Sequence, residues 1–262
     1  MDVPAAVSAL KAKVKAVHEE INITIDFHEA WRPTAYDGDL HARMGKSFAT
    51  NTFLVVRMAL RREMLLALVR LWDRDSNALG MVSIANTLKD RRILDALVTE
   101  CESSLVDQPV YDCSSDEALT PELKIIVEDY CRRDAFQLAK KQSRFLLSNA
   151  EDAVRIISSY AEGGPKHATL KYLKTLRNER LAHRQIVASE ASVNPADIKI
   201  EDFYQDMLIL LHKLLLAVEN THYEPSETAK IKQRHVELFW KASRGECDAD
   251  HPDYKVPVIY NY

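Results

Sequence analysis

The chain has 262 residues, 47% of them hydrophobic, and only six glycines. It is long enough for one large domain or two small ones, and its low glycine content favours helices. Its formal charge is −4 and its isoelectric point is near 6.2, which excludes a global positive field that would draw it onto nucleic acid or an anionic membrane. Any site for a polyanion must therefore be local.

The cysteines and the apolar segments indicate the compartment. The four cysteines are widely spaced and form no C-x-x-C pair, which argues against both a zinc knuckle and a disulfide framework. The N-terminal segment lacks a basic region followed by an apolar run, and the longest apolar stretch, 207–218, is broken by His212 and Lys213. We expect a cytoplasmic protein with no membrane segment.

The first third of the chain predicts two long helices separated by an irregular segment. Apolar residues three and four apart predict a helix from Pro4 to about Ile25. Residues 27–46 contain a proline and two glycines without a clear period, so we expect an irregular excursion with a short helix, in which Trp31 and Tyr36 fix a loop to the surface. A second long helix is predicted over 50–72.

The remainder also reads as helices joined by caps and short loops. Two short helices follow, the second starting at Asp90, and residues 106–119 form a loop. Thr120-Pro121 starts a long helix that ends before Gly163-Gly164-Pro165. Further helices are predicted at 167–187, from Asp197 or Glu201 to Val218, and at 226–243, followed by a tyrosine-rich tail at 246–262. These patterns predict one all-α domain over 1–262, with long antiparallel helices, short accessory helices and a core at about 49–222.

The stretch 176–184, LRNERLAHR, places unusual charge on a helix that should pack in the core. At about 100° per residue, the leucines of this helix define an apolar sector around Leu173. Arg177, Arg180 and Arg184 fall inside that sector, at roughly 40°, roughly −20° and roughly 20°. An unpaired buried guanidinium costs several kcal/mol, so this face must meet acids, a wet cleft, an interface or an anionic ligand. A purely structural network with Asp73 or Glu63 is one of these alternatives.

His183 lies at the edge of the same sector, at about −80°. Beside arginines, an imidazole becomes a candidate acid-base group, because it titrates near neutral pH while guanidiniums hold a phosphate. Such a reaction needs no metal or cofactor. Arg177 and His183 point about 120° apart on a straight helix, so either the helix loosens near His183 or a second copy completes the site. Of the two, we expect a homodimer with the 167–187 helices paired.

These residues resemble a known family. The string R-N-E-R-L-A-H at 177–183 is similar to the signature of the HEPN superfamily (higher eukaryotes and prokaryotes nucleotide-binding), an arginine and a histidine separated by a short gap. The ending L-A-H-R, with R-L-W-D-R-D-S-N-A-L at 70–79, resembles the AbiU-like branch, named for phage abortive infection. The resemblance covers about 49–222.

The resemblance implies a dimeric helical bundle and, in active members, metal-independent cleavage of RNA through attack of the 2′-hydroxyl. It implies that His183 is the acid-base group, that Arg177 holds the scissile phosphate and that Asn178 orients it. Their positions within the apolar sector of the helix add Arg180 and Arg184 as phosphate-guiding residues. This predicts an endoribonuclease acting in antiphage defence or as a toxin, with a possible antitoxin partner.

Two alternatives stay open. A non-catalytic HEPN module could bind RNA, nucleotide or a protein partner through the same cleft, and the acidic isoelectric point favours weak nonspecific binding to nucleic acid. A purely structural reading pairs the arginines fully with acids. The chain also departs from members that are regulated by nucleotidyltransferase antitoxins, because Gln185 replaces the tyrosine two residues after the histidine.

Overall fold

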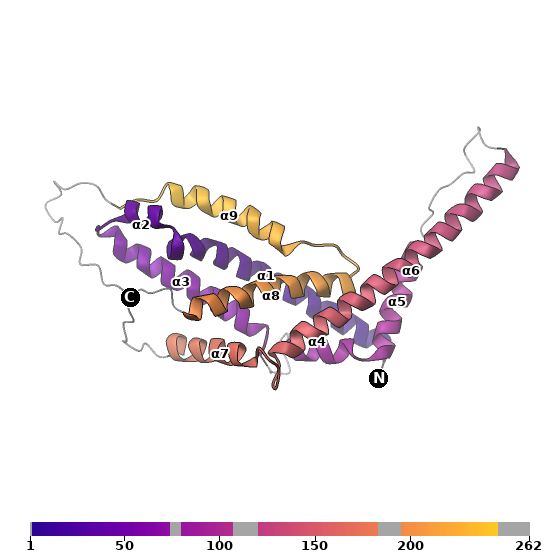
Figure 1. The fold of residues 1–262 in the computed structure, drawn as a ribbon, viewed down its shortest axis with the longest axis horizontal. Coiled ribbons are helices and arrows are strands. Elements are labelled where there is room, and N and C mark those ends of the chain that lie inside the picture. The colour runs from indigo at the N-terminus through magenta and orange to yellow at the C-terminus, as the bar shows by residue number, and fades with distance from the viewer. Residues whose placement is uncertain (1, 74–79, 107–119, 183–194, 246–262) are drawn as a thin grey trace. The chain divides into compact units, whose positions relative to one another are not determined.

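The computed structural model describes residues 2–73, 80–106, 120–182 and 195–245, and every regular element among them is a helix (Figure 1). The all-α prediction is confirmed. The helices are α1 (Val3–Tyr36), α2 (Gly38–Met44), α3 (Ala49–Arg70), α4 (Met81–Leu88), α5 (Arg91–Val106), α6 (Pro121–Tyr160), α7 (His167–Ala182), α8 (Pro195–Val218) and α9 (Pro225–Lys241). No helix of these stretches is long and apolar enough to cross a membrane.

Several predicted helix boundaries are confirmed by their caps. The Asp90 carboxylate accepts the backbone N–H of Arg92 at 3.0 Å, which satisfies a donor in the first turn of α5. The Thr120 hydroxyl accepts the N–H of Leu123 at 3.4 Å and begins α6. Gly163 has a φ of +83° just beyond the end of α6, a conformation that glycine adopts without strain.

The irregular excursion predicted at 27–46 is wrong in its first part. Helix α1 continues through Pro33 to Tyr36, and α2 is the short helix that was expected. A proline inside a helix costs about 3 kcal/mol, because it removes a hydrogen bond and crowds the preceding turn. Trp31, expected on a surface loop, is only 2% exposed. Burial of this ring and of the apolar face of α1 offsets the proline cost.

The described chain packs as two compact units. Unit 1 comprises residues 1–15, 82–158 and 212–223, and unit 2 comprises residues 16–81, 159–211 and 224–262. Four of the five boundaries fall inside helices α1, α4, α6 and α8, and the fifth, at 223/224, lies between α8 and α9. The single domain over 1–262 stays a prediction.

Unit 1 is organised around small and apolar side chains of α6. Ala139, Leu146 and Ala150 are buried on one face of this helix. Polar contacts fasten its neighbours: the Gln142 amide donates to Asn220 at 2.7 Å, and the Ser143 hydroxyl donates to the carboxylate of Glu102 at 2.8 Å.

Unit 2 contains α3 and α7, which pack against each other (Figure 1). A cluster of Leu40, Met44, Phe53 and Trp240 joins α2, α3 and α9. The rings of Phe53 and Trp240 meet edge to face with centroids 5.8 Å apart, and the Trp240 indole donates to the carbonyl of Ala30 at 3.1 Å. This unit carries the residues that the sequence nominates as a site.

Candidate functional site

Helix α7 places its leucines in the core as the wheel predicts. Leu170, Leu173 and Leu176 are all buried. Three-residue spacing keeps them on one side of the helix, where they pack toward α3. Arg177 lies at about 40° on the same helix, between Leu173 and Leu170, so it falls within the sector of the buried leucines.

Arg177 meets the aspartate that follows the C-terminal turn of α3. Its Nη1 lies 3.1 Å from Oδ1 of Asp73, and the two side chains are 26% and 37% exposed. The prediction that Asp73 pairs with this arginine face is confirmed for Arg177. Glu63, the other candidate, pairs instead with the adjacent Arg62 at 3.0 Å.

A second cation of α7 reaches the same end of α3. The Nζ of Lys174 donates to the backbone carbonyl of Trp72 at 2.8 Å. The last carbonyls of a helix lack intrahelical partners and carry partial negative charge, so a cation is stabilised there. Lys174 and Arg177 lie about one turn apart on α7. They contact the successive residues Trp72 and Asp73, just beyond the end of α3.

The other predicted site residues are not placed by these contacts. Asn178 and Arg180 belong to the backbone of α7, but their side chains lie outside the described residues. His183 and Arg184 lie outside them entirely, as does the part of the predicted 167–187 helix beyond Ala182. The structure thus brings Arg177 to Asp73 and leaves the pairing of Arg177 with His183 a prediction.

A polar cleft of about 270 Å³ lies beside the first turn of α7. Its lining comes from the end of α6, the start of α7 and the first half of α8: Tyr160, Lys166, Thr169, Lys199, Asp202, Gln205 and Asp206. The Tyr160 hydroxyl and the Lys166 ammonium both donate to Oδ2 of Asp206 at 2.5 Å. Burial and the neighbouring Asp206 carboxylate raise the pKa of Tyr160, so the phenol stays protonated.

The sequence reading missed this cleft. Lys199, Asp202 and Asp206 are spaced three and four apart on α8, which places them on one face, yet the same spacing is common on solvated helices. The Gly-Gly-Pro turn after Tyr160 was the available signal, because it brings the end of α6 next to the start of α7.

A second missed feature is a buried ionisable cluster between α1 and α8. The His28 ring is 1% exposed and lies with Nδ1 2.8 Å from Oε1 of Glu29 and Nε2 2.8 Å from Oε2 of Glu201. The ring stacks on Tyr204 with centroids 3.7 Å apart, and the Tyr204 hydroxyl donates to Glu29 at 3.1 Å. Two carboxylates on opposite nitrogens favour a doubly protonated imidazolium.

The charge state of this cluster follows from competing effects. Burial alone lowers the pKa of His28, but the hydrogen bonds that its ring donates to Glu201 and Glu29 outweigh burial, and the pKa is raised. Burial raises the pKa of Glu201, yet its bond to His28 and the nearby Arg32 bring that pKa below its ordinary value. Burial and Glu29 raise the pKa of Tyr204. The cluster is an internal ion pair with a neutral phenol beside it.

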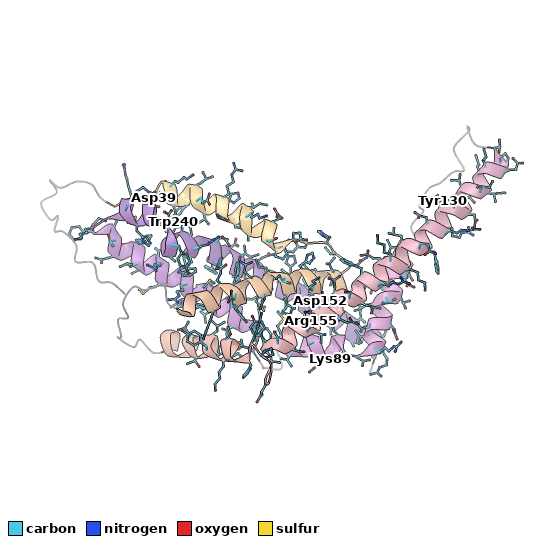
Figure 2. All side chains as sticks on the ribbon, in the orientation of Figure 1. Asp39, Lys89, Tyr130, Asp152, Arg155 and Trp240 are labelled. Carbon is cyan, nitrogen blue, oxygen red and sulfur yellow. The ribbon has the colours of Figure 1, made fainter. Side chains whose placement is uncertain are left out.

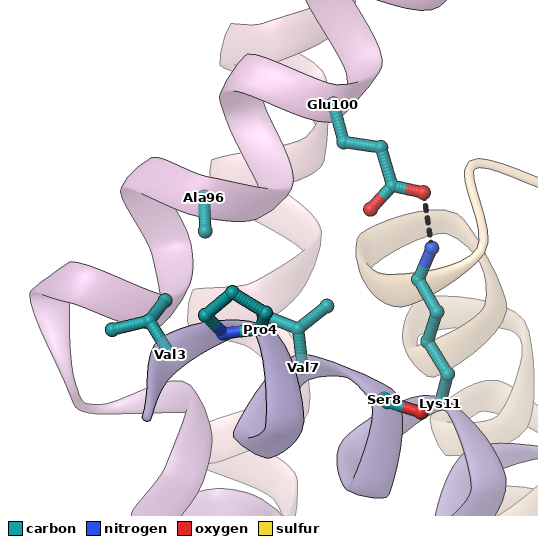
Figure 3. Close-up of a pocket in the computed structure, with 7 residues that line it drawn as sticks. All are labelled: Val3, Pro4, Val7, Ser8, Lys11, Ala96 and Glu100. Atoms are coloured by element: carbon teal, nitrogen blue, oxygen red, sulfur yellow. Dashed lines mark hydrogen bonds and ion pairs between the residues drawn. The ribbon is translucent and has the colours of Figure 1, made fainter. Parts of the chain in front are cut away.

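Unit 1 holds a larger hollow that lacks catalytic groups. A pocket of about 370 Å³ lies between the start of α1 and α5, lined by Val3, Pro4, Val7, Ser8, Lys11, Ala96 and Glu100 (Figure 3). Lys11 and Glu100 form an ion pair at its rim. The remaining lining is mostly apolar, with Ser8 as its other polar residue.

Comparison with known proteins identifies one relationship. The family model HEPN_AbiU2, described as AbiU2, matches residues 8–239, which extends well beyond the stretch at 49–222 that carries the resemblance. No curated protein and no solved structure matches the chain.

Proposed function

Since the chain belongs to the AbiU2 family of HEPN proteins, we propose that it is a metal-independent endoribonuclease of antiphage defence or of a toxin–antitoxin pair. The observation that carries this proposal is Arg177. It sits within the sector of the buried leucines of α7, oriented by Asp73 and still 26% exposed. A guanidinium held in this way suits a phosphate ligand, because its planar donors match phosphate oxygens.

The proposed reaction transfers the phosphoryl group within the RNA strand. The 2′-hydroxyl oxygen bonds to the adjacent phosphorus while the bond from phosphorus to the 5′-oxygen breaks, leaving a 2′,3′-cyclic phosphate and a 5′-hydroxyl. His183 removes the proton of the 2′-hydroxyl, or delivers one to the leaving oxygen. Arg177 stabilises the charge on the phosphate oxygens, Asn178 orients them, and Arg180 and Arg184 guide the flanking phosphates.

Asp73 then acts as a positioning residue. Its carboxylate fixes one side of the Arg177 guanidinium before RNA binds, so less side-chain entropy is lost when the phosphate arrives. The Asp73 carboxylate also competes with the RNA phosphate for Arg177, because it neutralises part of the charge that attracts the phosphate. The two effects are separable by substitution of Asp73.

A homodimer with paired 167–187 helices is part of the proposal. Arg177 and His183 lie about 120° apart on one straight helix, so two copies related by a two-fold axis let each phosphate contact both groups. Mixing an Arg177→Ala chain with a His183→Ala chain tests this arrangement, because a shared site recovers part of the activity in the mixed dimer.

The direct test compares RNA cleavage by wild type and by His183→Ala, in buffer containing a chelator. His235→Ala is the matched control, since His235 is exposed on α9. We expect cleavage to products with cyclic phosphate ends by wild type and the control, and a loss of at least about a hundredfold in His183→Ala. Unchanged cleavage in His183→Ala, or none in wild type, would refute the catalytic assignment.

One observation favours a second function, a non-catalytic HEPN module that binds RNA, nucleotide or a protein partner. The Asp73–Arg177 ion pair already balances the charge of Arg177, and the whole chain carries a net charge of −4. This function predicts binding without cleavage, weakened by Arg177→Ala and by added salt. A titration of labelled RNA at two salt concentrations separates it from the enzyme.

A further inference from the structure

The N-terminal part of α6 has no interior packing of its own. Within the described helix, none of residues 121–134 is buried, and Ala135 is the first buried side chain. This part carries large apolar residues, among them Ile126 at 62% exposure and Tyr130 at 69% exposure (Figure 2). Isolated helices of this length are marginal in water, so a covering surface would stabilise it.

Five of the seven exposed large apolar residues of α6 form a stripe, whereas Ile125 and Phe136 lie off it, at about 200° and about 220°. With Leu123 set at zero and about 100° per residue, Ile126 lies at about −60°, Tyr130 at about −20°, Leu138 at about 60° and Phe145 at about 40°. All five side chains are exposed. From Leu123 to Phe145 the stripe covers about 33 Å of helix, at about 1.5 Å per residue. We call these five residues the α6 stripe.

The α6 stripe is separate from the face that packs inside unit 1. On the same wheel, the buried residues Ala135, Ala139 and Leu146 lie at about 120°, about 160° and about 140°. Their centre is more than about 100° from the centre of the stripe. The stripe is therefore a second apolar face of one helix, turned away from the core of its own unit.

Three charged residues lie within the sector of the stripe: Arg144 at its edge, at about −60°, and two more, Asp134 and Lys141, that suit an antiparallel pair. Asp134 lies at about 20° and Lys141 at about 0°, both within the sector of the stripe, and both are exposed. They are seven residues apart, so they occupy the same position of successive heptads. One is an acid and the other a base, which suits a surface that faces a reversed copy of itself.

We propose that the C-terminal part of the α6 stripe, Tyr130, Leu138 and Phe145, binds the same residues of a second copy of this chain, in an antiparallel pair about a two-fold axis between residues 137 and 138. In that register Asp134 of each copy faces Lys141 of the other, and Tyr130 faces Phe145. The two Leu138 side chains meet beside the axis. The contact is isologous, since each copy contributes the same surface.

Charge selects this register over its neighbours. A shift by one heptad places Asp134 against Asp134 of the other copy, and a shift the other way places Lys141 against Lys141. A parallel, in-register pair would bring both like-charged pairs together at once. Like charges in a contact cost several kcal/mol, so the alternatives are disfavoured. The interface differs from the proposed α7 pairing and does not depend on it.

Charge reversal in the full chain tests the pairing by sedimentation equilibrium. Asp134→Lys alone and Lys141→Asp alone should each raise the dimer dissociation constant at least about tenfold, because each creates a like-charge contact. The double variant should return to within about threefold of wild type, because the pair is restored with its signs exchanged. Glu128→Lys, the same charge change at about 140° on the wheel, is the control and should leave association unchanged.

A second pair of variants tests the apolar part. Leu138→Asp should weaken association, because the two Leu138 side chains meet beside the axis, whereas Ile125→Asp should not, because Ile125 is 68% exposed but lies at about 200°, off the stripe. Circular dichroism and the melting temperature confirm that all variants fold. A monomeric wild type at the highest attainable concentration, or single reversals that do not alter association, overturns the proposal. RNA cleavage is a separate readout, so failure here leaves the α7 assignment independently testable.

Discussion

Helices α6 and α7 depart from ordinary amphipathic patterning in opposite directions. Helix α7 sets Arg177 within a face made by buried leucines and balances it with Asp73. Helix α6 leaves Leu123, Tyr130 and Phe145 in solvent, on a face that its own unit does not cover. Misplaced charge needs a partner within the chain, whereas misplaced apolar surface calls for a partner outside it.

The contrast separates two kinds of functional signal. The charge on α7 is visible in the sequence, because an arginine among leucines violates the expected pattern. The α6 stripe is not visible, because an apolar stripe at helical spacing reads as core until its burial is known. Substitutions on α7 should therefore change RNA cleavage, and substitutions in the α6 stripe should change self-association.

The largest expected effect follows from removal of the α7 charge. Arg177→Ala should lower RNA cleavage by about a hundredfold to a thousandfold, because a preorganised cation on the phosphate is lost. Lys174→Ala should cause a much smaller loss, since its ammonium binds the carbonyl of Trp72. Single-turnover rates for both variants measure the difference, and equal losses would mean that the two cations have the same role.

Removal of the buried charge of His28 in unit 2 should cause a large loss of unfolding free energy. The Glu29 side chain is 4% exposed, and in His28→Ala it keeps its hydrogen bond from the Tyr204 hydroxyl but loses its buried cation. Breaking such a buried pair costs about 3 to 5 kcal/mol of unfolding free energy. Denaturant unfolding measures the loss, with His235→Ala as the exposed control. A loss below about 1 kcal/mol would show that the cluster is solvated in solution.

The same cluster predicts a pH dependence. The pKa of His28 is raised in the folded protein, so its stabilising contribution is full below its unfolded value of about 6.5 and is lost as pH rises through the raised value. The pKa of Glu201 is lowered, so its contribution is present above its unfolded value and is lost as pH falls. The free-energy difference between wild type and His28→Gln should therefore shrink on the alkaline side.

Hydrogen exchange should divide α6 into two parts. On dilution below the dimer dissociation constant, amides of 130–134 should exchange at least about tenfold faster, because that part loses its cover. Amides of 146–157 should keep their protection at every concentration, since Leu146, Ala150 and Ile157 are buried in unit 1. Exchange that does not vary with concentration along all of α6 would argue against self-association.

The smallest effect is expected at Asp73. Asp73→Asn should lower the unfolding free energy by less than about 1 kcal/mol, because both members of its ion pair are partly exposed. Its effect on RNA distinguishes the two roles: slower cleavage with similar binding indicates that Asp73 positions Arg177, while tighter binding indicates competition with phosphate. Asp129→Asn, which removes an exposed ion pair on α6, is the control.

Local patterning predicted the helices and the apolar face of α7 because those features depend on spacing within one segment. The Asp73 partner was also accessible, since an acid beside the end of α3 is an obvious counter-ion for an inward arginine. The continuation of α1 through Pro33 could not be predicted, because burial of Trp31 in the tertiary structure overrides the local cost of a proline inside a helix. The bond from His28 to Glu201 joins residues 173 positions apart, and no short-range pattern announces such a pair.

The division into two units has a consequence for gene architecture. Unit 1 is assembled from three stretches, 1–15, 82–158 and 212–223, with parts of unit 2 between them. The shortest continuous piece of chain that contains all of unit 1 is therefore 1–223, which also includes most of unit 2. No single cut or fusion point separates one unit from the other, so a recombination event must inherit the two together.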